Sequence, residues 1–440
     1  MIFLSEKLSP PYKPILFTFY LFLFTLSFFF LSCEKSTAPE NKPQVTLTAE
    51  YVGVTEAEFL LQTRNTEPNT QYQLFRDDSL ISDGILIYND TTITDTLLLP
   101  AYNYIYNARL ITDGKSVANS QPLDIATMDS TSHKFQWETF SFGGLGSSLL
   151  YDVAIINEND IWAVGEIYSD TVQTWLPYNA VHWDGQQWEL KRIPFIGSCS
   201  AVDYPPIRAI WAFSENNILF TNGGAIAKYN GSSSYLDCGM NALLDGAITK
   251  IFASDPSNIY AVGGSGTIVR YGGQGWQKLE SGTETVINDV WGFDRRGETL
   301  ILATVSNEYH PGYDFLLLSI SPFHVSDTLW NGMLRPLHSV WFNEYSPIYI
   351  SGDGLHEYKR GKWHEIDIPP YFGNRVRGSG INNIFVAGAF GLVVHYNGWD
   401  WHHYPSLMMN GTLLGLAAIA DLTVAVGERD NYAYIIVGRK

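Results

Sequence analysis

The sequence predicts an all-β protein in which a β-sandwich is followed by a seven-bladed β-propeller. Three observations indicate this fold class. Aromatic residues make up 14% of the 440 residues and charged residues only 16%, with 38 Gly against 6 Met, a balance that favours strands and tight turns. Short segments of alternating polarity fill residues 45–127, and a strand pattern recurs at a fixed period from residue 133 onward.

The N-terminal segment has the features of an export signal. Lys7 and Lys13 precede an uncharged, mostly apolar run from Ile15 to Ser32, and this run ends directly at Cys33. The polar stretch EKSTAPENKP follows the cysteine. An apolar run of this length is also compatible with a retained membrane-spanning helix. Either arrangement places the rest of the chain outside the cytoplasm.

The residues around Cys33 resemble the signal of bacterial lipoproteins, in which a small residue precedes a cysteine that is acylated and becomes the mature N-terminus. Phe30 departs from that pattern, where Leu is usual. The resemblance implies a signal peptide at residues 1–32, lipidation of Cys33 and a flexible tether at residues 33–43. It also implies a lipid-anchored protein of the outer membrane, on its periplasmic or its cell-surface side.

Charge and cysteine content limit the possible partners. The formal net charge is −18 and no cluster of Lys and Arg occurs along the chain, which argues against a nucleic-acid partner. Beyond Cys33, only Cys199 and Cys238 remain, in a compartment where disulfides persist. Sequence separation does not say whether their Cβ atoms lie within bonding reach, so a disulfide between them stays open.

Residues 44–128 have the pattern of a β-sandwich. The expected strands are VTLTAEYV, AEFLLQT, YQLFRD, TTITDTLLL, YNYIYNARL and LDIAT. In LLPAYNYIYNARL, the spacing of Leu98, Pro100 and Tyr104 resembles the strand that enters the tyrosine corner of fibronectin type III domains, and Tyr106 and Ala108 continue the alternation. The Trp usual on the second strand of that family is absent from AEFLLQT. Modules of this kind are commonly spacers, so the resemblance implies little about binding.

Residues 133–440 contain an internal repeat. The segment IWAVG at residue 161 returns as ILFTN, IYAVG, IYISG, IFVAG and TVAVG, and each copy is preceded by a second strand and followed by a third. Five turn dipeptides join the last two strands of a unit, where we expect two-residue hairpins with positive φ. They are Asp184-Gly185, Asn230-Gly231, Gly272-Gly273, Arg360-Gly361 and Asn397-Gly398. The repeat resembles those of secreted bacterial propellers related to photosystem assembly factors and to the sialidase-type repeat group.

The length of the repeat region predicts seven blades. Its 308 residues divide into seven units of 44, within the range of about 40 to 45 that such blades need. The fourth unit is the most divergent, and we expect its outer strand near residues 327–330. The last unit ends at Lys440 one strand short, whereas HKFQWETF at residue 133 matches the outer strands of other units. The N-terminal strand is therefore expected to complete the last blade and close the ring.

The glycine-rich stretch GGSG, residues 263–266, is predicted to be a turn. A dinucleotide-type phosphate loop needs a third glycine and a following helix. Here Val269 occupies the place of that glycine, and the next segment, TIVRY, is a strand.

One end of the ring is predicted to bind a ligand, because three connectors expand there, at residues 166–178, 194–206 and 306–313. Aromatic side chains suited to stacking on sugars or anchoring a peptide occur in these loops and in a neighbouring one. They are Tyr168, Trp175, Tyr178, Tyr204, Tyr309, Tyr313, Tyr371 and Phe372. Packing of these rings onto the rim is the competing interpretation.

Signals of catalysis are weak. The Ser-x-Asp-x-Gly-x-x-Trp box of sialidase-type repeats and the G-x-S-x-G motif are both absent, and we predict no catalytic residue, metal site or cofactor. His402 and His403 are adjacent and would point to opposite faces of a strand. The sequence favours a non-enzymatic envelope protein that binds a glycan or a protein. A lyase or hydrolase with acidic and His residues at the propeller mouth, and a structural scaffold, are the alternatives.

Overall fold

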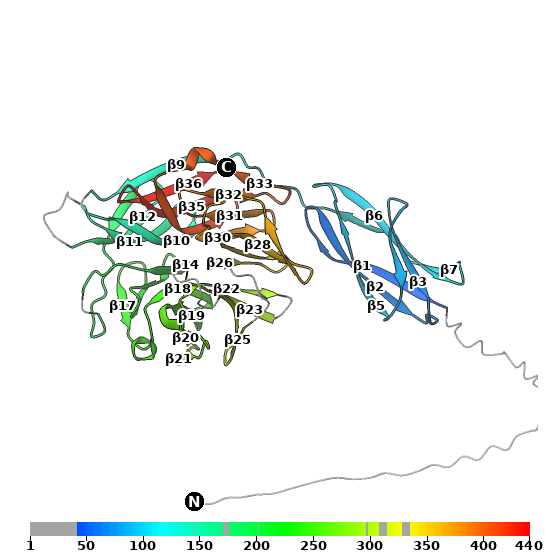
Figure 1. Ribbon diagram of the computed structural model, residues 1–440, viewed down its shortest axis with the longest axis horizontal. Coiled ribbons are helices and arrows are strands. Elements are labelled where there is room, and N and C mark those ends of the chain that lie inside the picture. The colour runs from blue at the N-terminus through cyan, green and yellow to red at the C-terminus, as the bar shows by residue number, and fades with distance from the viewer. Residues whose placement is uncertain are drawn as a thin grey trace, which may run out of the picture. The chain divides into compact units, whose positions relative to one another are not determined.

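Strands make up nearly all of the regular structure in the computed structural model (Figure 1). It describes residues 42–144, 146–169, 176–200, 202–295, 298–307, 315–327 and 335–440. The predicted signal peptide, Cys33 and nearly all of the tether lie outside these residues. Three short 3₁₀ turns complete the regular structure of the described part: η1 (Asn241–Leu243), η2 (Gly264–Gly266) and η3 (Pro405–Leu407).

The first eight strands form two sheets. One sheet has the order β1-β2-β5, and the other has the order β4-β3-β6-β7, with β8 also paired to β6. Their bounds are β1 (Gln44–Val52), β2 (Glu56–Arg64), β3 (Gln71–Arg76), β4 (Ser79–Ile85), β5 (Asp90–Thr96), β6 (Asn103–Thr112), β7 (Lys115–Asn119) and β8 (Leu123–Ala126). The sequence missed β4 and β7, because both strands are largely exposed and lack an apolar alternation.

A single core lies between these two sheets. Phe59 of β2 and Tyr106 of β6 are fully buried, and their ring centroids lie 4.3 Å apart. Tyr104, on the same face of β6, directs its hydroxyl oxygen toward the backbone N–H of Leu99, which donates to it at 2.9 Å. This bond fixes the chain where it enters β6.

The remaining strands form seven four-stranded sheets, which we number in chain order. Sheets 1 to 6 each take four consecutive strands, and sheet 7 has the order β34-β35-β36-β9. The strands are β9 (Gln136–Phe142), β10 (Leu149–Asn157), β11 (Asp160–Ile167), β12 (Tyr178–Trp183) and β13 (Trp188–Lys191); β14 (Ala209–Ser214), β15 (Asn217–Thr221), β16 (Ile226–Tyr229) and β17 (Ser234–Asp237); β18 (Ile248–Asp255), β19 (Asn258–Gly263), β20 (Ile268–Tyr271) and β21 (Trp276–Leu279); β22 (Ile287–Arg295), β23 (Glu298–Val305), β24 (Leu316–Ile320) and β25 (Val325–Asp327); β26 (Leu337–Trp341), β27 (Ile348–Gly352), β28 (Gly354–Lys359) and β29 (Lys362–Ile366); β30 (Arg375–Gly380), β31 (Asn383–Ala387), β32 (Val393–Tyr396) and β33 (Trp401–His403); β34 (Gly411–Ile419), β35 (Leu422–Arg429) and β36 (Tyr432–Arg439).

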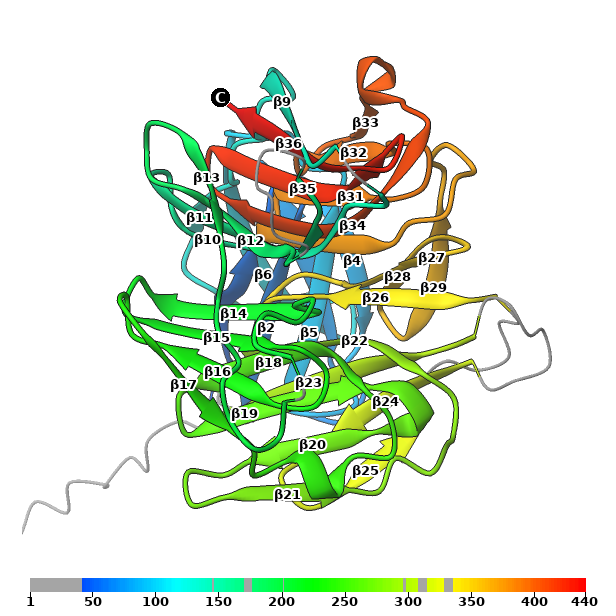
Figure 2. The same cartoon turned by 90° about the vertical axis from the view of Figure 1, so that its left-hand side faces the viewer.

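The seven sheets are arranged in a ring (Figure 2). The first strand of each sheet lies next to the first strand of the following sheet, and β34 of sheet 7 lies next to β10 of sheet 1. An apolar cluster fills each of the seven junctions between neighbouring sheets, including the junction of sheets 7 and 1. Burial of apolar surface therefore stabilises the ring at every junction.

Strand β9 closes the ring as the sequence predicted. It pairs antiparallel with β36, with Trp137 opposite Gly438 and Ser141 opposite Tyr434. In both views β9 lies beside β36 (Figures 1 and 2). The ring of Trp137 also packs on Tyr404 of sheet 6, with centroids 4.8 Å apart. The two ends of the repeat region are thus held in one sheet.

A histidine pair lies just before the closing strand. The amide nitrogen of Asn383 faces the backbone carbonyls of Ala420 and Ile419, so its oxygen faces Nε2 of His395 at 2.9 Å. Because that oxygen only accepts, Nε2 of His395 donates, and burial followed by the charge of His133 lowers the pKa of His395 to about 3. The ring of His395 is therefore neutral, and its Nδ1 accepts a hydrogen bond from Nδ1 of His133 at 2.8 Å.

The turns differ from the sequence prediction in one respect. The glycines of the turn dipeptides do have positive φ, including Gly185 and Gly398. However, only Arg360-Gly361 is a two-residue hairpin loop, and the four other predicted hairpins have four-residue loops. In the first of them the side chain of Asp184 accepts the N–H groups of two loop residues and so replaces a tighter backbone turn.

Two further expectations concern single segments. The GGSG stretch is a turn, since η2 leads directly into β20. The outer strand of sheet 4 is β25, which includes Asp327, and residues 328–330 of the predicted segment lie outside the described part of the chain.

Candidate functional site

The expanded connectors lie at one end of the ring. In every sheet the first strand starts at this end, so the connector from the second to the third strand and the connector to the next sheet meet there. The long connectors join β11 to β12, β13 to β14 and β23 to β24. Residues 170–175, 201 and 308–314 of these connectors lie outside the described part of the chain.

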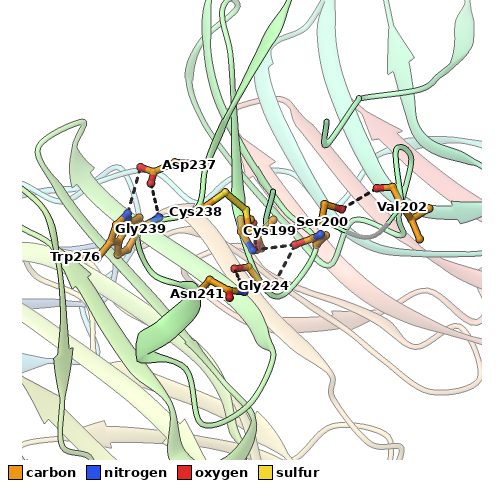
Figure 3. Close-up of a disulfide and its surroundings, with 12 residues drawn as sticks. Cys199, Ser200, Val202, Gly224, Asp237, Cys238, Gly239, Asn241 and Trp276 are labelled. Atoms are coloured by element: carbon orange, nitrogen blue, oxygen red, sulfur yellow. Dashed lines mark hydrogen bonds between the residues drawn. A yellow bond between two sulfur atoms is a disulfide. The ribbon is translucent and has the colours of Figure 1, made fainter. Parts of the chain in front are cut away.

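The connector from β13 to β14 contains a loop that is braced from several directions, residues 194–206, here called the braced loop. Phe195 is fully buried, and its N–H donates to the carbonyl of Asp203 at 2.7 Å. A disulfide joins Cys199 to Cys238, which follows β17, with their Cα atoms 5.7 Å apart (Figure 3). The open question of the cysteine pair is thereby answered. The base of the loop is fixed by a buried ring and its tip by a covalent bond.

The residues beside the disulfide are also fixed. Asp237 accepts a hydrogen bond from the N–H of Gly239 at 2.9 Å and one from the indole N–H of Trp276 at 3.2 Å (Figure 3). Trp276 belongs to sheet 3, so the segment that carries Cys238 is anchored to the next sheet.

The braced loop is joined to the end of the connector between β11 and β12. The buried amide of Asn179 donates to the carbonyls of Ile193 and Pro205 at 2.9 and 3.0 Å and accepts the N–H of Ile193 at 2.7 Å. Arg192 donates to the carbonyl of Leu176 at 3.0 Å and lies over the ring of Tyr178 at 4.0 Å. We call the braced loop and residues 176–179 together the stitched loops.

The stitched loops expose aliphatic side chains. The exposed fractions are 68% for Ile196, 50% for Val202 and 46% for Leu176. Exposed apolar side chains on an ordered loop are available for contact with another apolar surface at a low cost in conformational entropy.

Five of the predicted aromatic residues lie in the described part of the chain. Tyr168, Tyr178, Tyr204, Tyr371 and Phe372 are all half-buried. Tyr168 donates its hydroxyl to Glu166, and Tyr371 and Phe372 pack on Phe390 and His338, respectively. Trp175, Tyr309 and Tyr313 lie outside the described residues. Packing onto neighbouring groups therefore occupies much of the surface of the described rings.

A group of charged residues that the sequence analysis did not identify lies in the centre of the ring. Asp152 of β10 accepts the N–H of Ile210 in the next sheet at 3.2 Å, and its other oxygen lies 2.5 Å from the ammonium nitrogen of Lys250, one sheet further on. One carboxylate thus joins sheets 1, 2 and 3.

The same arrangement recurs three sheets later. Asp289 of β22 accepts the N–H of Val340 at 3.2 Å and lies 3.1 Å from a guanidinium nitrogen of Arg375, so it joins sheets 4, 5 and 6. This copy has one more cation than the first. Arg377 makes two hydrogen bonds to the same carboxylate, at 2.8 and 2.9 Å. We call Asp152, Lys250, Asp289, Arg375 and Arg377 the channel network.

The channel network is buried, and its members shift one another's pKa values. The side chains of its members are at most 11% exposed. Burial opposes ionisation of Asp289, but Arg377 and Arg375 outweigh it and hold the pKa of this carboxyl well below its usual value. Burial, with a contribution from Arg375, lowers the pKa of Lys250 to about 8. Lysine 250 is thus mostly protonated at neutral pH.

A cavity of about 180 Å³ adjoins the channel network. Lys250, Arg377 and Asp152 line it together with the indole rings of Trp211 and Trp291. The lining continues along the later parts of the first strands, such as Leu416–Ala418 of β34. The cavity therefore extends toward the short turns between first and second strands, at the end of the ring opposite the stitched loops.

The repeat itself holds a signal for the channel network. When the units are aligned on their first strands, Asp152, Lys250, Asp289 and Arg375 occupy one position, which Ala209, Ser339 and Gly415 fill in the other units. Charged residues of both signs at one position of a buried strand would have indicated a central network. Arg377 stands two residues further on, where the other units have apolar residues.

The described residues were also searched for a metal site and for a membrane-spanning helix. Among the described residues, no group of three or more His, Cys, Asp or Glu side chains is placed to hold a metal ion. Trp211 of β14 and Trp291 of β22 pack on each other, with ring centroids 6.1 Å apart. Within the described ranges, no helix has the length and apolar character to cross a bilayer.

Comparisons with known proteins identify the architecture of the ring. No protein family and no curated protein matches the chain. Among solved structures, the chain is similar to YCF48 bound to D1 peptide, with a TM-score of 0.52 and 14% identity over 71% of this chain and 99% of that one. It is also similar to the WD40 β-propeller domain of Doa1, with a TM-score of 0.49 and 12% identity over 69% and 96% of the two chains. The first similarity, together with the closed ring of four-stranded sheets, shows a β-propeller fold.

Proposed function

We propose that this chain is a non-enzymatic, lipid-anchored scaffold of a bacterial cell envelope that binds a protein partner through the stitched loops of a seven-bladed propeller. The observation that carries this proposal is the combination of exposed Ile196, Val202 and Leu176 with loops that a disulfide and a buried amide hold in place. A preordered apolar surface loses little entropy on binding, so more of its contact energy contributes to affinity.

A protein partner fits these loops better than a glycan. Sugars are commonly held by exposed aromatic faces, whereas the described aromatic side chains are half-buried and Arg192 covers the ring of Tyr178. Aliphatic side chains instead match the apolar core of a protein–protein interface. The solved structure of YCF48 bound to D1 peptide supports the idea that a propeller of this kind accommodates a peptide.

The other parts of the chain would place this surface in the envelope. We propose that residues 44–128 form a fibronectin type III-like spacer and residues 133–440 the propeller. The three-plus-five division of the strands and the Tyr104–Leu99 hydrogen bond support the first assignment. Residues 1–32 would be a signal peptide, and a lipid on Cys33 would anchor the chain through residues 33–43. Palmitate labelling that persists in Cys33→Ala would disprove the anchor.

The binding surface is tested by site-specific photo-crosslinking in intact cells. A crosslinker at position 196 should yield a protein adduct that is absent when the crosslinker replaces Phe323, an 88% exposed residue on the β24–β25 hairpin. With the captured protein purified, Ile196→Glu should weaken binding at least about tenfold, because it places a charge in an apolar contact, while Phe323→Glu should bind as the unchanged chain does. Equal adducts at both positions, or binding to glycans alone, would contradict the proposal.

A further inference from the structure

The channel network contains more positive than negative charge. Asp152 and Asp289 supply two negative charges, and Lys250, Arg375 and Arg377 supply three positive ones. His338, also in the centre, adds none, because burial followed by Arg375 lowers its pKa to about 4. The described centre of the ring thus holds a buried surplus of one positive charge at neutral pH.

The surplus has a definite origin. The pair Asp152–Lys250 and the pair Asp289–Arg375 are equivalent copies, each neutral, at one position of the repeat. Arg377 is the additional cation, and six apolar side chains fill its position in the other units, among them Trp211 and Trp291. A buried charge that no opposite charge balances is costly, so the additional arginine at this position calls for a compensating anion.

The cavity offers a place for such an anion. Both Arg377 and Lys250 line it, so two cations from separate sheets border the same space. Among the described residues, the Lys250 ammonium donates to Asp152 alone, and because an ammonium has three N–H groups, donor capacity remains toward the cavity. The volume of about 180 Å³ is sufficient for one small anion with accompanying water.

We propose that the central cavity binds a small monovalent anion, such as chloride or a simple carboxylate, between Lys250 and Arg377. The anion neutralises the surplus charge of the channel network and so stabilises the ring. This site lies at the end of the ring opposite the stitched loops, and it does not depend on the protein-binding function proposed above.

Thermal unfolding of the full chain tests the proposal. The melting temperature is compared in 100 mM sodium chloride, bromide or acetate and in 100 mM sodium gluconate, a monovalent anion too bulky for the cavity, at one pH and ionic strength. The small anions should raise Tm by about 2 °C relative to gluconate, because a ligand that binds only the folded state stabilises it. Equal melting temperatures in all four salts would overturn the proposal.

Two variants separate a site from a general salt effect. Arg377→Met removes the surplus charge and leaves Asp289 paired with Arg375, so the difference between chloride and gluconate should vanish whatever the absolute Tm of the variant. Arg377→Lys keeps the charge and should keep the difference. The proposal is wrong if all three proteins respond alike. Anomalous scattering from bromide-soaked crystals should place an ion within hydrogen-bond reach of Lys250 or Arg377, and bromide found only elsewhere would also refute it.

Discussion

Near the axis of the ring, a single carboxylate joins three sheets. Farther from the axis, the disulfide and the histidine pair each connect only two neighbouring parts of the ring. Asp152 and Asp289 reach across to the second sheet along because the seven first strands converge on one axis. Cys199 lies on the connector that leads into sheet 2, and Cys238 directly follows β17, the last strand of that sheet. The distance of a side chain from the axis of the ring therefore determines how many sheets it can contact. A change at the centre should weaken the whole ring, and a change at the rim should act locally.

The largest effect is expected for Asp289→Asn. This change leaves Arg375 and Arg377 buried without a carboxylate, and removal of one partner of a buried ion pair typically costs about 3–5 kcal/mol. Asp152→Asn is the matched comparison, because its one charged partner, Lys250, has a pKa of about 8 and can lose its proton, so the loss of stability should be clearly smaller. Urea unfolding of both variants measures the difference. Equal losses would show that Asp152 and Asp289 contribute equally to the stability of the ring.

A smaller effect is expected when the disulfide is removed by Cys199→Ser together with Cys238→Ser. A crosslink of this kind contributes about 2–4 kcal/mol when the unfolding is global. Because the bond is at the rim, we expect local opening to come first: limited proteolysis should cut the braced loop at least about tenfold faster, while hydrogen exchange in the first strands is unchanged. Faster exchange in β10 and β14 would instead show that the rim and the centre are coupled.

The features of the fold that could be predicted from the sequence are those with a local or a repeated sequence pattern. Alternating strands, glycine turns and the match between residue 133 and the outer strands were sufficient for the order of the sheets and for the pairing of β9 with β36. Strands β4 and β7 were missed because exposed strands lack the apolar signal.

The parts that the sequence did not predict depend on distances across the ring. Whether Cys199 bonds to Cys238 follows from the folded loop, and 39 residues of separation do not determine it. The partner of Asp152 stands two repeats away, so neither residue looks unusual within its own unit. The described aromatic residues of the loops were identified as a group, but their packing onto Glu166, Phe390 and His338 reduces the exposure on which sugar binding would depend.

The smallest effect is expected at the histidine pair of the outer edge. The folded state holds the pKa of His395 near 3, below the ordinary value of 6.5, so the unfolded chain binds more protons between these two values. Stability should therefore fall as pH decreases below about 6.5, by about 1–2 kcal/mol at pH 5 for this group. His395→Gln removes the titration and keeps a donor toward Asn383, so its unfolding free energy should fall less steeply with acid. His324→Gln, at an exposed histidine, is the control and should follow the unchanged chain. If both variants show the same acid slope as the unchanged chain, the contact between the closing strand and sheet 6 does not depend on a neutral His395.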